Sequence, residues 1–439
     1  MKTGSRNIAL SIREYINSVP LYRVIIALLF YLPAFVDSLT GFLLHISDYK
    51  SISTIDLSPS ILLRLIIMFL SFFYLKKGFQ THFMFAIMLF ILSVEFIGYL
   101  AIHHNITGLF IGLNWSIKVL YAISVGLFLY NMIRSEKITY NELVLLFRTA
   151  VILYSLSIFI PFIFGGGIPT YGKESLTFGR IGYLANGNGA GALQGIGSII
   201  SFHIYRSNKN FKNLILYLLN LVTCYIVATK GTLVFCTINL ILIFYYSRLS
   251  IKLISICLVI ILLTQIPDNM TQVLFKSYDV VKFRYDRSAN FLLFLWSGRD
   301  AYFTDAINSF NIDGFAFIRI LCGFGAFVAF RNTGYGFEDT HTRYFLEAEM
   351  FDMFFMYGLI GLISYFLFFG SGIMLAIKRR RFFLIIPLIL CWFYSAFAGH
   401  MLFNGMSILG VMVLYILIIM PMNEYDIFKK KKKEIAGDG

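Results

Sequence analysis

Long apolar runs separated by short polar connections dominate the pattern of hydrophobic and polar positions along the chain. A helix that crosses the hydrocarbon core of a bilayer needs about 20 largely apolar residues. By that criterion the pattern predicts about twelve spans. They are expected near residues 23–45, 59–75, 81–103, 109–133, 142–165, 184–205, 213–229, 231–247, 250–267, 349–377, 382–400 and 402–422. We therefore predict an all-α, polytopic integral membrane protein with one transmembrane domain over residues 1–439.

The composition agrees with this class. The chain is 58% hydrophobic and 14% charged, whereas soluble domains are about 45–50% apolar and about 25% charged. The net charge of +14 does not indicate nucleic-acid binding, because the basic residues lie mainly in alternate short connections and at both termini. Lys and Arg in short loops favour the cytoplasmic side. We expect a multi-pass protein with both termini in the cytoplasm.

No metal or cofactor is expected. No acidic pair has the pattern of a metal-binding DxD motif, and none of the five cysteines has zinc or CxxC spacing. The cysteines are expected to be small buried hydrophobes.

The connection over residues 268–348, between the ninth and tenth spans, is much longer than an ordinary loop. It is rich in Phe, Tyr, Leu and Trp, which is not the composition of a disordered segment. The predicted orientation places it on the outer side of the membrane. We expect short amphipathic helices lying on the outer face, with DAYFTDAINSF (300–310) as one candidate.

Several cations fall on the predicted outer side. Lys230 stands between two apolar segments in YIVATKGTLVF, so its ammonium must find water, headgroups or an anionic partner near the outer membrane face. Arg180 lies in the Gly-rich connection before the sixth span, and the long loop adds Arg299 and Arg343. Such cations suit a lipid-linked diphosphate. Snorkelling side chains and surface ion pairs are the alternative.

Acidic residues crowd the end of the long loop in GFEDTHTRYFLEAEMFDMFFMYGLIG (336–361). Glu349 and Asp352 are three residues apart and share one helix face at the mouth of the tenth span. Two roles remain open. They pair with loop arginines such as Arg343 and hold the loop over the bundle, or one of them is a general base.

Charged residues also occur inside the predicted spans. The clearest are Asp37, Arg64, Glu95, Lys118 and Arg148, all within the first five spans. Lys118 and Arg148 are expected to face the bundle, where Glu95 could neutralise one of them.

Four segments, taken in order, resemble motifs of the O-antigen polymerase and ligase superfamily. GYLANGNGAGALQ (182–194) is similar to its Gly/Asn-rich start of a middle helix, and ATKGTLVF (228–235) to its Ser-x-x-Arg-Gly stretch. WSGRDAYF (296–303) resembles its Ser-Gly-Arg segment early in the periplasmic loop. EAEMFDMFFMYGLIG (347–361) resembles its Glu-x-x-Asp followed by Gly-x-x-Gly. The resemblance covers roughly residues 180–400.

The resemblance implies a GT-C-like, metal-independent and inverting glycosyltransferase of the bacterial inner membrane. Its substrates would be undecaprenyl-diphosphate-linked oligosaccharides, one as donor and one as acceptor, and a chain-length regulator protein is a further partner. It places the donor diphosphate at Lys230 and Arg299, with Arg180 as a third candidate. The acceptor hydroxyl must lose a proton, and Glu349 or Glu338 is the expected base, with His341 as the next candidate.

Two alternative functions remain. A ligase relative would transfer the glycan to lipid A-core. Its characteristic His stands about a dozen residues before the Gly-x-x-Gly, whereas His341 precedes Gly358 by 17 residues, which favours a polymerase. A polysaccharide flippase or transporter is the alternative of another class, but it would show two related halves, and none are visible here.

Overall fold

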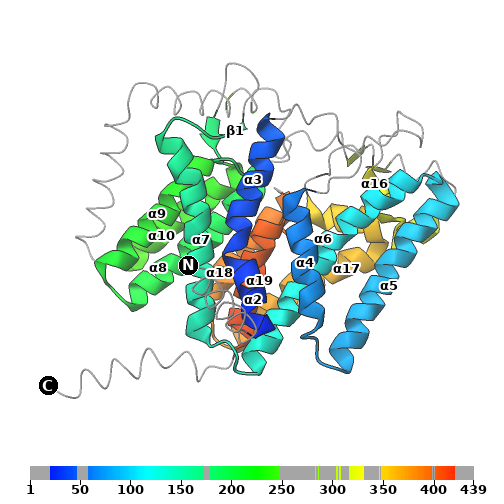
Figure 1. Cartoon of the computed structure of the whole chain (residues 1–439), viewed down its shortest axis with the longest axis horizontal. Coiled ribbons are helices and arrows are strands. Elements are labelled where there is room, and N and C mark those ends of the chain that lie inside the picture. The colour runs from blue at the N-terminus through cyan, green and yellow to red at the C-terminus, as the bar shows by residue number, and fades with distance from the viewer. Residues whose placement is uncertain are drawn as a thin grey trace, which may run out of the picture.

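Helices form nearly all of the secondary structure in the computed structural model of the chain (Figure 1). The structure describes residues 20–46, 58–171, 178–246, 282, 285, 303–304, 306–307, 316–330, 346, 348–397, 399 and 401–420. The helices are α2 (Leu21–Phe30), α3 (Leu32–Ile46), α4 (Pro59–Phe72), α5 (Phe79–Gly98), the π-helix η2 (Tyr99–His103), α6 (Ile106–Arg134), α7 (Tyr140–Ile163), α8 (Gly187–Ser207), α9 (Phe211–Val227), α10 (Lys230–Tyr246), α15 (Ala316–Cys322), α16 (Gly325–Phe330), α17 (Glu349–Lys378), α18 (Phe382–Phe397) and α19 (Gly405–Ile419). In the same part of the chain, strands β1 (Pro169–Tyr171) and β2 (Phe178–Arg180) form an antiparallel hairpin.

The predicted spans correspond to helices wherever the structure describes them. Every predicted span except 250–267, which lies outside the described residues, overlaps a helix. Four spans are long and apolar enough to cross a membrane: α5 with η2, α6, α7 and α17. The pair α2 and α3, bent by 45°, is a fifth candidate, and several other apolar helices are shorter. Long apolar helices in this number indicate a multi-pass membrane protein.

Polar residues at helix starts explain where several helices begin. An asparagine side chain accepts backbone N–H groups of the first turn, which otherwise have no partner inside the helix. The asparagines are Asn105 before α6, Asn186 before α8, Asn210 before α9 and Asn404 before α19. Thr139 and Glu142 form a reciprocal capping box at the start of α7. These caps set the boundaries within long apolar stretches.

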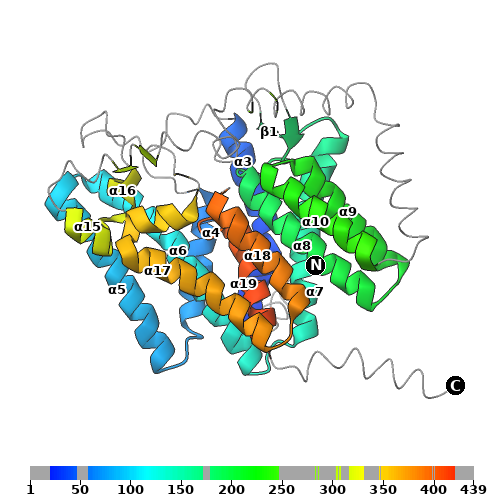
Figure 2. The same ribbon diagram turned by 180° about the vertical axis from the view of Figure 1, so that it is seen from behind.

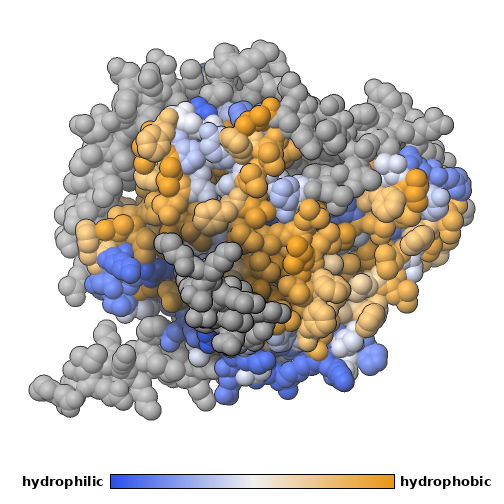
Figure 3. Space-filling model, in the orientation of Figure 1, coloured by the Kyte–Doolittle hydropathy of each residue, from blue (hydrophilic) through white to orange (hydrophobic). Residues whose placement is uncertain are grey.

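Basic connections gather at one end of the bundle, which is the lower end in Figure 1. The Lys137 ammonium lies 5.2 Å from the ring centres of both Tyr22 and Tyr74, so the α6–α7 turn meets the start of α2 and the end of α4. Arg381 donates to the Met420 carbonyl at 2.5 Å, which joins the α17–α18 turn to the end of α19. Figure 3 shows hydrophilic residues along this margin below a broad apolar band. The grouping agrees with the predicted alternation of spans.

The centre of the bundle is α19. Its Ile408, Val411 and Leu414 are fully buried, and it packs against α6, α8, α17 and α18. Large apolar side chains on peripheral helices are instead exposed, as at Phe79 (82%) and Leu89 (68%) on α5. Apolar residues both inside and outside are what a lipid-embedded bundle requires.

Buried hydrogen bonds link the helices on one side of α19. Ser155 Oγ of α7 lies 2.9 Å from Gln194 Oε1 of α8 and 2.9 Å from Asn220 Oδ1 of α9. The Asn220 amide donates to Ser201 Oγ at 2.7 Å. Because lipid tails are as apolar as leucine, such contacts and close packing hold membrane helices together. Three helices are thereby fixed relative to one another.

Part of the long connection enters the bundle. The expected short helices are present as α15 and α16, and α16 is buried at the upper end of the bundle, where Ala326 and Phe327 pack among α5, α6 and α17 (Figure 2). Glu95 of α5 accepts the Ala326 N–H at 2.8 Å, which holds the start of α16. In the candidate segment 300–310, the described positions are helical, and Phe303 packs 5.1 Å from the Phe351 ring.

Helix α17 is broken inside its predicted span. Tyr357 and Gly358 have non-helical backbone angles, and Gly358 has φ 62° and ψ −153°, a conformation that is open essentially to glycine alone. A Cβ on Gly358 would lie 2.5 Å from the backbone of Leu321 and Cys322. The end of α15 therefore docks into the break.

Candidate functional site

The predicted site residues divide into two groups. Arg180, Lys230, Glu349 and Asp352 are described by the structure. Arg299, Glu338, His341 and Arg343 lie outside the described residues, so their predicted roles stay predictions. All four described residues lie at the end of the bundle opposite the basic connections, which is the upper end in Figure 1.

The β-hairpin carries Arg180 to the turn that contains Lys230. Thr170 Oγ1 of β1 donates to the carbonyl of Val227, the last residue of α9, at 2.7 Å. Arg180 pairs with Pro169 in the hairpin, and its guanidinium donates to the Gly167 carbonyl at 2.7 Å. Lys230 is the first residue of α10. Two of the predicted cations therefore flank the end of α9.

The turn between α9 and α10 is tightly built. Ala228 has φ 52°, a left-handed conformation that is uncommon for a residue with a side chain. Thr229 Oγ1 accepts the Thr232 N–H at 3.3 Å and lies 3.3 Å from the Tyr394 hydroxyl of α18. A Cβ on Gly231 would lie 1.8 Å from the Tyr394 ring. Glycine is thus required at position 231 by close packing, which fixes the backbone next to Lys230.

Glu349 is fully buried, so the expectation of a half-buried carboxylate at the membrane mouth is wrong. Its Oε1 accepts the Leu402 N–H at 2.7 Å and the Phe403 N–H at 3.1 Å. Its Oε2 accepts the Ser395 hydroxyl at 2.5 Å. The turn between α18 and α19 folds back over the start of α17 and supplies the two backbone donors, while the end of α18 supplies the Ser395 hydroxyl. This carboxylate therefore positions the turn that precedes α19.

Asp352 is also buried, and its Oδ1 accepts the Leu346 N–H at 3.0 Å. Leu346 belongs to the last part of the long connection, so this hydrogen bond joins that segment to α17. The predicted pairing with Arg343 lies outside the described residues.

Four helix N-termini meet at this end of the bundle: those of α8, α10, α17 and α19. Tyr394 links two of them, since its hydroxyl donates to the Asn188 carbonyl of α8 at 3.0 Å while its ring covers Gly231 of α10. A Cβ on Gly189 would lie 2.3 Å from the Asn404 side chain, so the starts of α8 and α19 are also in contact. Helix N-termini carry partial positive charge and free N–H groups, which favour anions.

Sequence reasoning missed the residues that hold this arrangement, above all Tyr394, Ser395 and Asn404. Asn404 followed by Gly405 is a helix-start signal inside an apolar stretch, and it could have marked the beginning of α19. Tyr394 and Ser395 carry no such signal, because their contacts come from helices distant in sequence. The Gly-rich start of α8 serves close packing, as the contact of Gly189 with Asn404 shows.

Three charged side chains within the spans form buried contacts: Arg64, Asp37 and Glu95. Arg64 Nη2 lies 3.0 Å from Asp37 Oδ1. Glu95 accepts hydrogen bonds from Ser116 Oγ at 2.9 Å and from Ala326 N–H. Glu95 therefore accepts from neutral donors, and the expectation that it neutralises Lys118 or Arg148 is wrong.

Lys118 and Arg148 each contact a neutral side chain. The Lys118 ammonium lies 3.1 Å from the centre of the Trp115 ring, which is a cation–π contact. Arg148 donates to Asn213 Oδ1 of α9 at 2.8 Å. Both residues use polar or aromatic side chains of the protein rather than lipid, as expected for charges inside spans.

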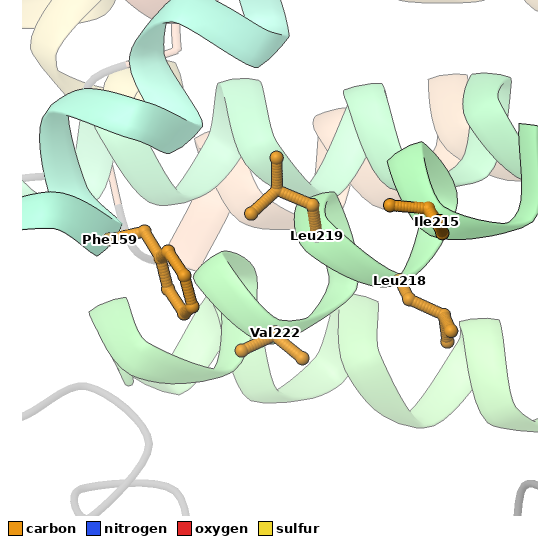
Figure 4. A pocket seen from close by; sticks show the side chains of 5 residues that line it. All are labelled: Phe159, Ile215, Leu218, Leu219 and Val222. Carbon is orange, nitrogen blue, oxygen red and sulfur yellow. The ribbon is translucent and has the colours of Figure 1, made fainter. Parts of the chain in front are cut away.

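A shallow apolar groove lies between α7 and α9, lined by Phe159, Ile215, Leu218, Leu219 and Val222 (Figure 4). Its upper end is close to the hairpin, because a Cβ on Gly182 would lie 2.1 Å from the Ser157 carbonyl, two residues before Phe159. The groove therefore begins below the segment that carries Arg180.

The described residues contain no group of three His, Cys, Asp or Glu side chains that could hold a metal ion. Of the cysteines in this part of the chain, Cys224, Cys236 and Cys391 are buried and Cys322 is partly exposed. Comparison with protein families, curated proteins and solved structures finds no match to this chain.

Proposed function

We propose that the chain is a membrane glycosyltransferase of the O-antigen polymerase type. It transfers a growing glycan from undecaprenyl diphosphate onto the next lipid-linked repeat unit at the periplasmic face of the inner membrane. The observation that carries the proposal is that the hairpin carrying Arg180 contacts the end of α9, next to Lys230 and four helix N-termini, at the end of the bundle away from the basic connections. Positive groups at this place would stabilise the negative charge that develops on a departing diphosphate.

The chemistry requires that negative charge building on the departing diphosphate be offset. Lys230 supplies a point charge, and Arg180 supplies guanidinium N–H groups beyond the one that binds Gly167. Arg299, outside the described residues, is the third cation of the proposal. The groove between α7 and α9 lies where the prenyl chain of the same lipid would leave the cations.

The acceptor hydroxyl must lose a proton as it attacks the anomeric carbon, while the bond from that carbon to the diphosphate oxygen breaks. Glu349 is poorly suited to take this proton, because it is buried and already accepts three hydrogen bonds. We therefore assign the base role to Glu338 or His341, and we assign Glu349 to positioning the turn before α19.

The test is the surface-glycan ladder made by cells that carry single substitutions. Lys230→Ala and Arg299→Ala are expected to shorten or abolish the ladder by at least tenfold at normal protein levels. Lys209→Ala is the matched control, since it removes a lysine from the exposed connection at the opposite end. A normal ladder in both Lys230→Ala and Arg299→Ala would overturn the diphosphate assignment.

The phenotype of the deletion separates the polymerase from its ligase alternative. Loss of a polymerase leaves lipid A-core that carries one repeat unit, whereas loss of a ligase leaves bare core. Finding bare core would move the proposal to a ligase that uses the same cations.

A further inference from the structure

Arg64 and Asp37 form an ion pair between α4 and α3, within the predicted spans. Arg64 Nη2 lies 3.0 Å from Asp37 Oδ1 and 3.2 Å from Oδ2. The two side chains differ in exposure, at 19% for Arg64 and 4% for Asp37. Charged residues inside a membrane protein usually mark a functional position rather than a structural necessity.

Asp37 accepts hydrogen bonds from three side chains. Besides Arg64, the Ser60 hydroxyl and the Tyr154 hydroxyl donate to it, the latter at 2.6 Å. Arg64 is different, because both of its contacts with Asp37 come from the single nitrogen Nη2. Within the part of the chain that the structure describes, Asp37 is its only hydrogen-bond acceptor. Among the described residues, Nη1 is therefore left without a hydrogen-bond acceptor, whereas Nε lies against Gly405.

The Nε side of the Arg64 guanidinium packs against the start of α19. A Cβ on Gly405, the first residue of α19, would lie 1.8 Å from Arg64 Nε, so only glycine allows the guanidinium to reach this place. On the other side of the same turn, Asn404 contacts Gly189 of α8. The turn before α19 thus has Arg64 on one side and the α8–Tyr394–Lys230 group on the other.

This place is recessed in the bundle. The Ser60 N–H donates to Thr40 Oγ1 at 3.2 Å, which sets the start of α4 beside Thr40, while α3 continues to Ile46. The remaining six residues of α3 rise about 9 Å higher at 1.5 Å per residue. Figure 1 shows α3 extending above the start of α4. In such recessed surroundings a charge-assisted hydrogen bond to an anion is stronger than in water.

We propose that Arg64 is a second anion-binding position, which holds the phosphate of the lipid-linked acceptor. This inference rests on the proposed function, because a polymerase must hold two lipid diphosphates at once. Lys230 and Arg180 bind one of them, and Arg64 binds the other across the turn that Glu349 fixes. The two substrates are thereby brought to opposite sides of residues 401–405.

The competing explanation is that Arg64 only cross-links α3 and α4. Arg64→Gln and Asp37→Asn separate the two explanations, since each removes the same ion pair. A purely structural pair predicts equal consequences. The binding role predicts that Arg64→Gln loses a ligand position, while Asp37→Asn keeps it, because Asp37→Asn retains the guanidinium and leaves an amide oxygen that can still accept from Ser60 or Tyr154.

The experiment measures saturation binding of labelled undecaprenyl diphosphate to the full-length protein in nanodiscs. The wild type and Asp37→Asn are expected to bind two equivalents, and Arg64→Gln and Lys230→Gln one equivalent each. If Arg64→Gln unfolds the protein, the double variant Asp37→Asn/Arg64→Gln replaces it and is expected to bind one equivalent, since it leaves no buried charge unpaired.

The outcomes are distinguishable. If the wild type binds no probe, the proposed function fails and the inference fails with it. If Arg64→Gln binds as much probe as the wild type while Lys230→Gln binds less, the inference alone is overturned. Equal loss of binding in Arg64→Gln and Asp37→Asn also overturns it, because the pair is then structural.

Discussion

A buried carboxylate at the start of α17 holds together segments that are distant in the sequence. Glu349 joins α17 to Ser395 at the end of α18 and to Leu402 and Phe403 before α19. Two of its three donors are backbone N–H groups, which cost about 1–3 kcal/mol each when buried without a partner. Glu349 therefore fixes the position of this turn.

Glu349→Gln is expected to lower the free energy of unfolding by about 1–3 kcal/mol, because a neutral amide accepts these hydrogen bonds less strongly than a carboxylate. Ser395→Ala, which removes one donor only, should cost about 1 kcal/mol. Thermal unfolding of the purified protein measures both changes. If Glu349→Gln were as stable as the wild type yet made no glycan ladder, a base role for Glu349 would be restored.

At the scale of elements, the break in α17 illustrates how packing decides the path of a helix. Leu321 and Cys322 of α15 occupy the space beside Gly358, and Met356 lies against Gly323. An unbroken α17 would leave no room for the end of α15. The break therefore exists because a segment of the long connection is inserted there.

Gly358→Ala is expected to destabilise the protein by about 1–3 kcal/mol or more, since alanine is strained at this backbone conformation and its Cβ meets the α15 backbone. Gly370→Ala in the same helix is the matched control, because no atom lies within 4 Å of its Cβ. That variant should be neutral or more stable by about 0.5–1 kcal/mol. Equal melting temperatures for the two variants would contradict this account of the break.

The positions of the helices could be predicted because a bilayer imposes length and apolarity on each span. The break at Gly358 and the burial of α16 could not. Each depends on a contact between distant residues, such as Glu95 with Ala326, that leaves no mark in a local pattern. For the candidate site, the sequence predicted that Lys230 and Arg180 lie on the same side of the membrane. The contact between the Arg180 segment and the end of α9 depends on a hairpin of three-residue strands.

At the scale of the whole molecule, the bundle has one end with the basic connections and another with the candidate site. Lys209, in the exposed turn between α8 and α9, lies at the first end. Phe164, 83% exposed after the end of α7, lies at the second. The positive-inside pattern predicts that the first end lies in the cytoplasm.

Cysteine labelling tests that orientation. In spheroplasts, a membrane-impermeant maleimide is expected to label Phe164→Cys directly and Lys209→Cys only after permeabilisation. The unsubstituted chain is the control for its own cysteines, of which Cys224, Cys236 and Cys391 are buried. Labelling of Lys209→Cys in intact spheroplasts would reverse the topology and place the cations on the cytoplasmic side.

The short helices at the centre have a consequence for the membrane itself. α4 and α19 contain 14 and 15 residues, so they are about 21–23 Å long, against about 30 Å for a hydrocarbon core. A lipid whose phosphate is bound at Arg64 must dip below the plane of its neighbours while its isoprenoid tail stays among them. The first isoprene units would have to bend, and a thinner bilayer would reduce that bending. Transfer by this protein would then depend on the thickness of its host membrane as well as on its side chains.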